Sequence, residues 1–217
     1  MTAQISDEFL LDGTTYAVAA ASEDGLFDPA DLGLSPTGAS TANYNGYVAT
    51  FAVLRQRLTL RRLRASLYVE GEHWVRFPGP PIFGVYPNDE SSDPFGFNNV
   101  YEGLDLPLGY SGGLLVADEF IRPLYVHAGW HAAWKYRRVV ELVFVNGRLT
   151  ERVDRSKGIA EIRDVFAKEL GPDRAVGSVS RKDAEEVVGR VFDRDYGLTT
   201  WWEMREEFER LRLEDPD

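Results

Sequence analysis

The sequence predicts an α+β protein in which an antiparallel β-meander of about seven or eight strands precedes about three amphipathic helices. Two observations support this fold class. Up to residue 155, short apolar and β-branched runs alternate with turn signals, which is typical of strands. From about residue 156, apolar residues recur with the period of an α-helix. We expect a barrel-like or strongly curved sheet over residues 1–155, with the helical segment 156–217 packed on it as part of one domain.

Turn signals separate the expected strands. Asp12-Gly13 precedes the first apolar run, and Asn146-Gly147 lies between the last two apolar runs of the β region. Asn-Gly is strongly favoured in a two-residue hairpin turn, because both turn positions need positive φ. Strands joined by such short turns pair antiparallel. The expected strands cover residues 14–20, 47–54, 58–69, 100–106, 114–117, 138–145 and 148–154.

The helical segment has its own start and stop signals. The first helix is expected to end at Gly171, which a proline follows. Ser180, with Asp183 three residues later, is expected to cap the second helix. Thr200 and Glu203 have the capping-box pattern of a third helix. Each helix has an apolar stripe along one face, so each needs the sheet or another helix to cover it.

Two long loops interrupt the β region, at residues 22–46 and 77–99. In the first loop, Asp28-Pro29 followed by Gly33 predicts a single helical turn with proline at its first position. The second loop holds five of the eleven prolines and several aromatic residues. We expect this second loop to pack over one end of the sheet, and the alternative is that it lines a binding site.

The composition excludes several classes of protein. The chain has 217 residues and no cysteine, which rules out a disulfide scaffold, a thiolate zinc site and a cysteine nucleophile. It has no apolar run long enough for a membrane span and begins with an acidic segment, so we expect a cytoplasmic protein. The phosphate-loop, dinucleotide-binding and common serine-nucleophile motifs are missing, so no cofactor is expected.

The formal net charge of −11 is the sum of opposed blocks. Residues 1–54 carry seven acids and no base, whereas residues 55–64 carry five arginines. Residues 65–121 are again acidic, and residues 122–155 are basic. Such blocks either neutralise one another in the folded chain or create a surface potential that steers a partner. The overall acidity argues against a nucleic-acid partner.

The acidic blocks suggest a non-catalytic interaction protein of the bacterial inhibitor, immunity or regulatory type that docks a basic protein partner. Opposite charges steer two such proteins together and set their orientation. The candidate partner-binding residues are acids of the two long loops, namely Asp24, Asp28, Asp31, Asp89, Glu90 and Asp93.

The arginine blocks suggest an alternative, a β domain, with or without enzymatic activity, that binds a small anion or a nucleotide. Arg57 and Arg61 are expected on one face of a strand, as are Arg148 and Arg152, because side chains alternate along a strand. Together with His127 they form the candidate ligand-binding set, in a pocket covered by the second long loop. Arginine suits this role, since its guanidinium forms paired hydrogen bonds with phosphate or carboxylate.

His127 and His131 have the spacing of two metal ligands on one helix face, but no glutamate follows the first histidine as in a zinc-protease motif. On a strand, the two side chains would lie about 13 Å apart, too far for one metal ion. We therefore expect a structural or surface role for this pair, without a metal. Paired carboxylates elsewhere are interpreted as solvated surface. The oligomeric state stays open.

Overall fold

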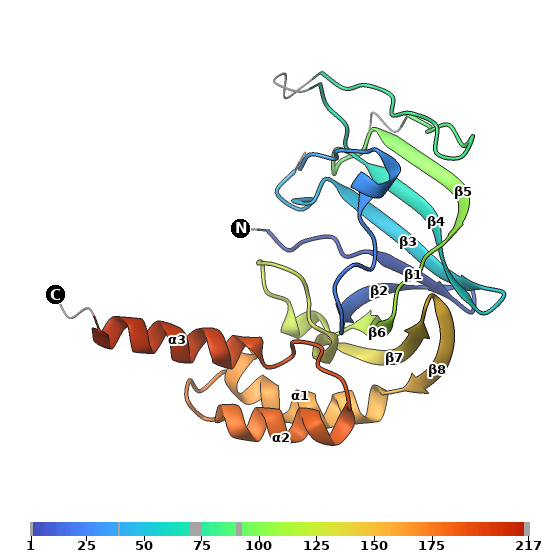
Figure 1. Ribbon diagram of the computed structural model, residues 1–217. Helices are drawn as coiled ribbons and strands as arrows, with labels where there is room; N and C mark the ends of the chain where they lie inside the picture. Colours follow the sequence, from blue (N-terminus) through green and yellow to red (C-terminus); the bar gives the residue numbers. More distant parts are fainter. Residues whose placement is uncertain (1, 39, 70–74, 90–92, 215–217) are drawn as a thin grey trace.

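The computed structural model describes residues 2–38, 40–69, 75–89 and 93–214. It has an eight-stranded, mostly antiparallel sheet that closes into a ring, followed by three helices (Figure 1). The predicted α+β fold class is confirmed. The strands are β1 (Glu8–Leu11), β2 (Thr14–Ala21), β3 (Tyr47–Leu54), β4 (Arg57–Ala65), β5 (Asn99–Pro107), β6 (Gly112–Phe120), β7 (Tyr136–Val145) and β8 (Arg148–Asp154). The helices are α1 (Ser156–Leu170), α2 (Arg181–Val191) and α3 (Thr200–Glu214), with short 3-10 turns η1 (Pro29–Leu32), η2 (Arg122–Leu124) and η3 (Ala133–Lys135).

The ring closes because β4 pairs with both ends of the strand order. The order is β3-β1-β2-β6-β7-β8-β4-β5, and β3 also pairs with β4. The contact between β4 and β8 is a single register pair, Arg57 with Arg148. Strand β1 pairs with β3 in parallel, unlike the other neighbours. Four residues are too few to show a period, and the sequence did not indicate β1.

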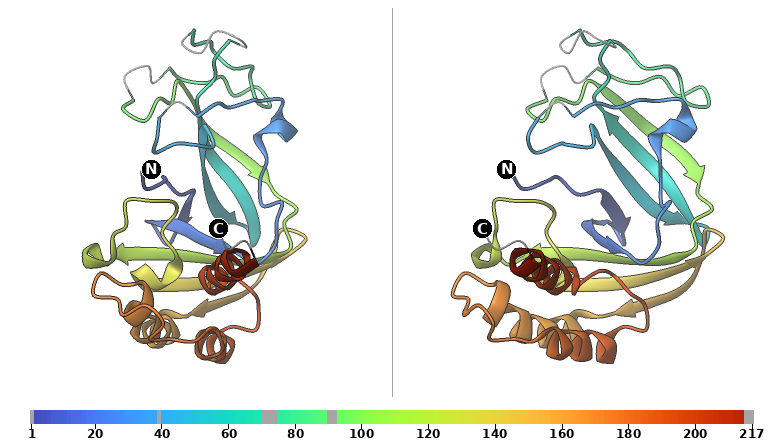
Figure 2. Two further views of the ribbon diagram at one scale, coloured as in Figure 1. Left: turned by 90° about the vertical axis from the view of Figure 1, so that its left-hand side faces the viewer. Right: turned by 60° about the vertical axis from the view of Figure 1, so that its left-hand side comes forward.

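Two hydrophobic cores lie on opposite faces of β6 and β7. Leu114 and Leu142 point into the ring and belong to its inner core. Leu115 and Val139 point to the opposite face of the same strands and belong to a second core against the helices. Figure 2 shows α1 and α2 on the outer side of these strands and the N-terminal strands on the other. This alternation makes β6 and β7 the shared wall between the ring and the helical layer.

The local signals correctly mark the end of α1 and the starts of α2 and α3, although the capping contact expected at Thr200 differs. Helix α1 ends at Leu170, directly before Gly171. Ser180 and Asp183 form the expected capping box of α2. At the start of α3, the hydroxyl of Thr200 instead donates to the Gly197 carbonyl at 2.8 Å. None of the helices in the described part of the chain has the length and apolar character to cross a membrane.

The loop at residues 77–99 lies at one end of the sheet, beyond β5 and the start of β3 (Figure 1). Ile82 and Phe97 are buried and fasten it to the ring, and the hydroxyl of Tyr101 donates to the Pro80 carbonyl at 3.0 Å. Phe83, by contrast, is 81% exposed. The loop is therefore only partly packed, and some of its aromatic residues face solvent.

Candidate functional site

Arginines of the block at residues 55–64 lie against acidic side chains of neighbouring strands. Arg64 of β4 is 3.0 Å from a carboxylate oxygen of Glu8 in β1. Arg61 pairs with Asp105 of β5. The opposed charge blocks thus neutralise each other where strands distant in sequence come together. The more exposed of these pairs, Arg61 with Asp105, contributes little to stability.

Glu141 on the outer face of β7 is fully buried and is shared by three partners. The hydroxyl of Tyr196 donates to its Oε1 at 2.6 Å, and Arg155 Nε donates to its Oε2 at 2.7 Å. Arg194 lies 3.7 Å from Oε1. Gly113 of β6 permits this approach, because a Cβ there would lie 1.9 Å from the Tyr196 hydroxyl. These contacts fasten the segment that follows α2 to the sheet.

A second buried carboxylate, that of Glu169 in α1, holds the helical layer together. It accepts backbone N–H groups of Gly177 at 2.8 Å and Ser178 at 2.9 Å, and it pairs with Arg205 of α3. Burial raises the pKa of Glu169, but the N–H groups of Gly177 and Val179 and the nearby Arg205 outweigh this effect, so the pKa is lowered overall. The carboxylate therefore stays charged and joins the loop between α1 and α2 to α3.

A cavity of about 800 Å³ opens between the segment after β2, strand β4 and the connection from β5 to β6. We call it the Asp24–Asp31 pocket. Its volume is in the range that accommodates small molecules or a protruding side chain. Its apolar walls are Leu26, Phe27, Leu32, Leu60, Phe83, Leu106, Pro107 and Leu108, and its other lining residues are Asp24, Gly25, Asp31, Gly109, Tyr110 and Ser111.

The segment that carries the two aspartates is anchored at several points. The Ser22 hydroxyl accepts the Gly113 N–H at 2.8 Å, which extends the pairing of β2 with β6. Phe27 packs edge-on against Tyr47, with ring centroids 5.9 Å apart. Asp28 then caps η1 by accepting the Ala30 N–H at 2.9 Å. The predicted helical turn is confirmed, and it places the rim of the pocket on rigid backbone.

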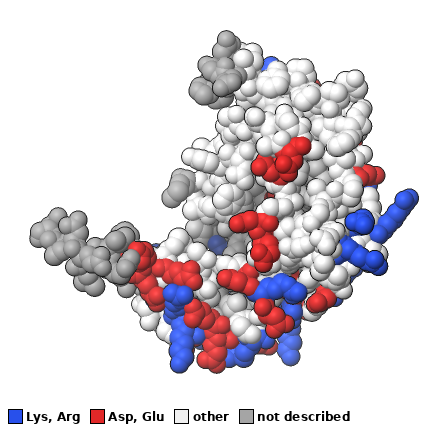
Figure 3. Space-filling model, in the orientation of Figure 1, with Lys and Arg blue, Asp and Glu red and all other residues white. Residues whose placement is uncertain are grey.

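Asp24 and Asp31 are exposed and have no ion pair or side-chain hydrogen bond with any described residue. They differ in this from Glu8 and Asp12 of the same acidic block, which pair with arginines. Figure 3 shows the same contrast. Acidic and basic side chains are interleaved over the helices, whereas on the β part the basic side chains gather at the right-hand edge, away from the acidic side chains in the middle of that face. Among the described residues that line the pocket, Asp24 and Asp31 alone are charged, so its rim is net negative.

The other predicted partner-binding acids that the structure describes do not line this pocket. Asp28 is used as the cap of η1. Asp93 accepts the Phe95 N–H at 2.8 Å, and Asp89 lines a separate recess of about 230 Å³ with Asn98 and Asn99. Glu90 lies outside the described residues. Of the five described candidates, the structure thus brings only Asp24 and Asp31 together at the Asp24–Asp31 pocket.

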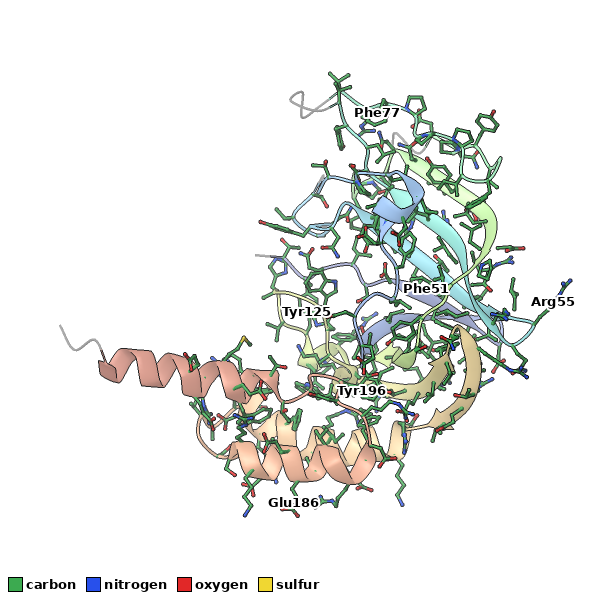
Figure 4. The ribbon with its side chains drawn as sticks, in the orientation of Figure 1. Phe51, Arg55, Phe77, Tyr125, Glu186 and Tyr196 are labelled. Atoms are coloured by element: carbon green, nitrogen blue, oxygen red, sulfur yellow. The ribbon has the colours of Figure 1, made fainter. Side chains whose placement is uncertain are left out.

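The predicted ligand-binding set separates into different places. Arg57 and Arg148 are register partners at the hairpin tips, and Arg61 shares the outer face of β4 with Arg57. Arg152 pairs with Asp12. His127 lies on the loop between β6 and β7, where its Nδ1 is 3.0 Å from the Tyr125 hydroxyl. The five residues do not line one pocket, and the loop at residues 77–99 covers the other end of the sheet (Figure 4).

The loop between β6 and β7 buries two basic side chains. Lys135 is 8% exposed and has no carboxylate partner among the residues that the structure describes; its Nζ lies 5.6 Å from the Trp134 ring centroid. His131 packs against Phe120 and Tyr125, and neither ring nitrogen has a hydrogen-bond partner in the described part of the chain. Burial lowers the pKa of both side chains. The two histidines thus flank Tyr125 rather than facing each other.

Comparison of this chain with protein-family models, with curated proteins and with solved structures found no match.

Proposed function

We propose that this protein is a non-catalytic binding protein that docks a basic partner at the Asp24–Asp31 pocket. One observation carries the proposal. Two exposed carboxylates without a basic partner among the described residues stand at the rim of an apolar cavity of about 800 Å³.

The chemistry of the pocket suits a side chain that is apolar along its length and cationic at its end. Arginine and lysine have this character, since their aliphatic stems pack on apolar walls while the charged group stays near water. Leu26, Phe27 and Leu106 supply such walls, and Asp24 and Asp31 supply acceptors for the cationic group. Hydrogen bonds between charged groups are stronger than neutral ones and would fix the orientation of the inserted side chain.

The remaining charge of the molecule supports a basic partner. The net charge of −11 attracts a basic protein over distances of about a Debye length, roughly 10 Å at 0.1 M salt. Much of the charge elsewhere is paired within the molecule, as at Glu8, Asp12, Glu141 and Glu169. The unpaired carboxylates at the pocket are therefore available to a partner.

The test is a titration with a synthetic peptide of alternating arginine and leucine residues, compared with the same peptide carrying glutamate in place of arginine. We expect the basic peptide alone to bind, and more weakly at 300 mM than at 50 mM salt. The double substitution Asp24→Asn with Asp31→Asn is expected to weaken binding by about tenfold, which corresponds to two exposed charge contacts.

The matched control is Asp89→Asn with Asp93→Asn, which removes the same number of negative charges from the other long loop. This pair should change the affinity by less than about twofold, because long-range attraction alone is strongly screened. Equal losses of affinity in the two double variants would contradict a role for the pocket. Failure of the unaltered protein to bind the basic peptide at low salt would contradict the proposed function itself.

A further inference from the structure

A second charged surface lies at the tips of two hairpins, and its recess shares one lining residue, Pro107, with the Asp24–Asp31 pocket. We propose that Arg55, Arg57 and Arg148, here called the arginine corner, bind a small molecule that carries two or more adjacent phosphate groups. Figure 3 shows basic side chains gathered at this edge of the molecule, and Figure 4 shows Arg55 pointing outward from it.

The corner is held by hydrogen bonds between the tips of the β3–β4 and β7–β8 hairpins. The Leu58 N–H donates to the Gly147 carbonyl at 2.8 Å, and the Leu149 N–H donates to the Gln56 carbonyl at 2.9 Å. These bonds make Arg57 and Arg148 register partners. Side chains at directly paired positions of antiparallel strands lie roughly 5 Å apart at Cβ, so the two guanidinium groups can reach one phosphate cluster.

The backbone at this tip is strained in a way that the other tips avoid. Arg55 and Gln56 have φ values of 49° and 66°, in the left-handed region. The other two tight turns place Asp12-Gly13 and Asn146-Gly147 at the equivalent positions. Aspartate, asparagine and glycine tolerate positive φ, whereas arginine and glutamine do so at a cost. Unfavourable residues at a turn indicate that the side chain there has a role other than folding.

Unlike other arginines of the sheet, the arginines of the corner have no ion pair with a described residue. Arg55, Arg57 and Arg148 are exposed and form no ion pair or side-chain hydrogen bond within the described ranges. Arg61, close by on the same face of β4, pairs with Asp105. A recess of about 600 Å³ is lined by Arg55, Arg57, Thr59 and this ion pair. The recess therefore has three arginines against one aspartate, with Arg148 adjacent.

The charge pattern around the corner favours a compact polyanion over a long one. Like-charged arginines in register repel each other, and a bound anion with several charges relieves this repulsion. An extended polymer would also run past the carboxylate of Asp105, which lines the same recess on strand β5. Adjacent phosphates on a small molecule concentrate the negative charge where the guanidinium groups are.

The test is isothermal titration with inorganic tripolyphosphate at 0.1 M salt. We expect the unaltered protein to bind it, and Arg57→Gln with Arg148→Gln to weaken binding at least tenfold. The matched control, Arg174→Gln with Arg190→Gln, removes two charges from the helical side and should leave the affinity within about twofold. Absence of binding by the unaltered protein, or equal affinities of the two double variants, would overturn the proposal.

A second variant separates binding from folding. Arg55→Asn with Gln56→Gly gives the turn its favoured dipeptide, so it should raise Tm by about 3 °C while weakening tripolyphosphate binding. A rise in Tm with unchanged affinity would overturn the role of Arg55. Equally tight binding of citrate would overturn the assignment to phosphate, and tighter binding of a single-stranded oligonucleotide would overturn the preference for a small ligand.

Discussion

The carboxylates of the helical layer and those of the Asp24–Asp31 pocket follow opposite rules. Glu141 and Glu169 are almost wholly buried, and arginines, a tyrosine and backbone N–H groups satisfy them. Asp24 and Asp31 are exposed and have no such partners among the described residues. Carboxylates thus hold structural elements together in the helical layer, whereas at the pocket they remain available to a partner.

This difference separates charges that serve stability from charges that serve recognition. A buried carboxylate must keep its partners, because an uncompensated charge in the interior costs several kcal/mol. An exposed carboxylate is solvated whether or not it has a partner, so folding places little demand on it. Substitutions in the two regions should therefore affect different measurements.

The largest effect is expected for Glu141→Ala. Glu141 is fully buried, so its removal leaves Arg155 and Tyr196 without their shared hydrogen-bond acceptor in the interior. The substitution should therefore lower the free energy of unfolding by about 3–5 kcal/mol. Urea denaturation followed by tryptophan fluorescence measures this change. Glu151→Ala, at an exposed position on β8, is the matched control and should cost less than about 0.5 kcal/mol. Similar losses in both variants would remove the distinction between the two regions.

Asp7 is an intermediate case, a largely enclosed carboxyl without an arginine partner in the described chain. Burial raises its pKa from 3.8 to about 6, although the Ala49 N–H donates to it at 2.8 Å. Because the folded pKa lies above the unfolded one, the cost of ionising Asp7 is absent below about pH 4 and grows as the pH rises through 6.

Asp7→Asn should therefore stabilise the protein at pH 8 by about 3 kcal/mol and leave its stability at pH 4 nearly unchanged. The asparagine amide oxygen keeps an acceptor for the Ala49 N–H. Urea titrations of the variant and the unaltered protein, made side by side at several pH values between 4 and 8, measure the difference. A variant that is less stable than the parent at pH 8 would show that the charged form of Asp7 is favoured.

The smallest effect on stability is expected at the pocket. Asp24→Asn with Asp31→Asn should change the free energy of unfolding by less than about 0.5 kcal/mol, since neither side chain has a partner in the described residues. The same variant is expected to lose affinity for the basic peptide. A large loss of stability, seen as a lower urea midpoint, would indicate that these aspartates, like Glu141, are needed for the stability of the fold.

Local signals in the sequence predicted most of the elements. Residues 47–54 and 148–154 match β3 and β8 in full, because turn residues flank each run and the apolar pattern is clear. The four residues of β1 were missed, since their pairing with β3 is set by the ring. The site was harder to predict. Six acids were candidates. The predicted turn at Asp28-Pro29 marks Asp28 as a cap, but nothing local distinguished Asp24 and Asp31, at the pocket, from the acids of the other long loop.

The sequence by itself determined most of the strands, turns and helices, because turn dipeptides, apolar periods and caps act over a few residues. Only the tertiary structure decided which charges are left unpaired. Arg152 and Asp12 are 140 residues apart, and the closed ring brings them together. Ring closure equally placed Arg57 beside Arg148, and neither side chain has an ion pair with a described residue. Pairing of distant charges depends on strand order and register, which no local pattern specifies.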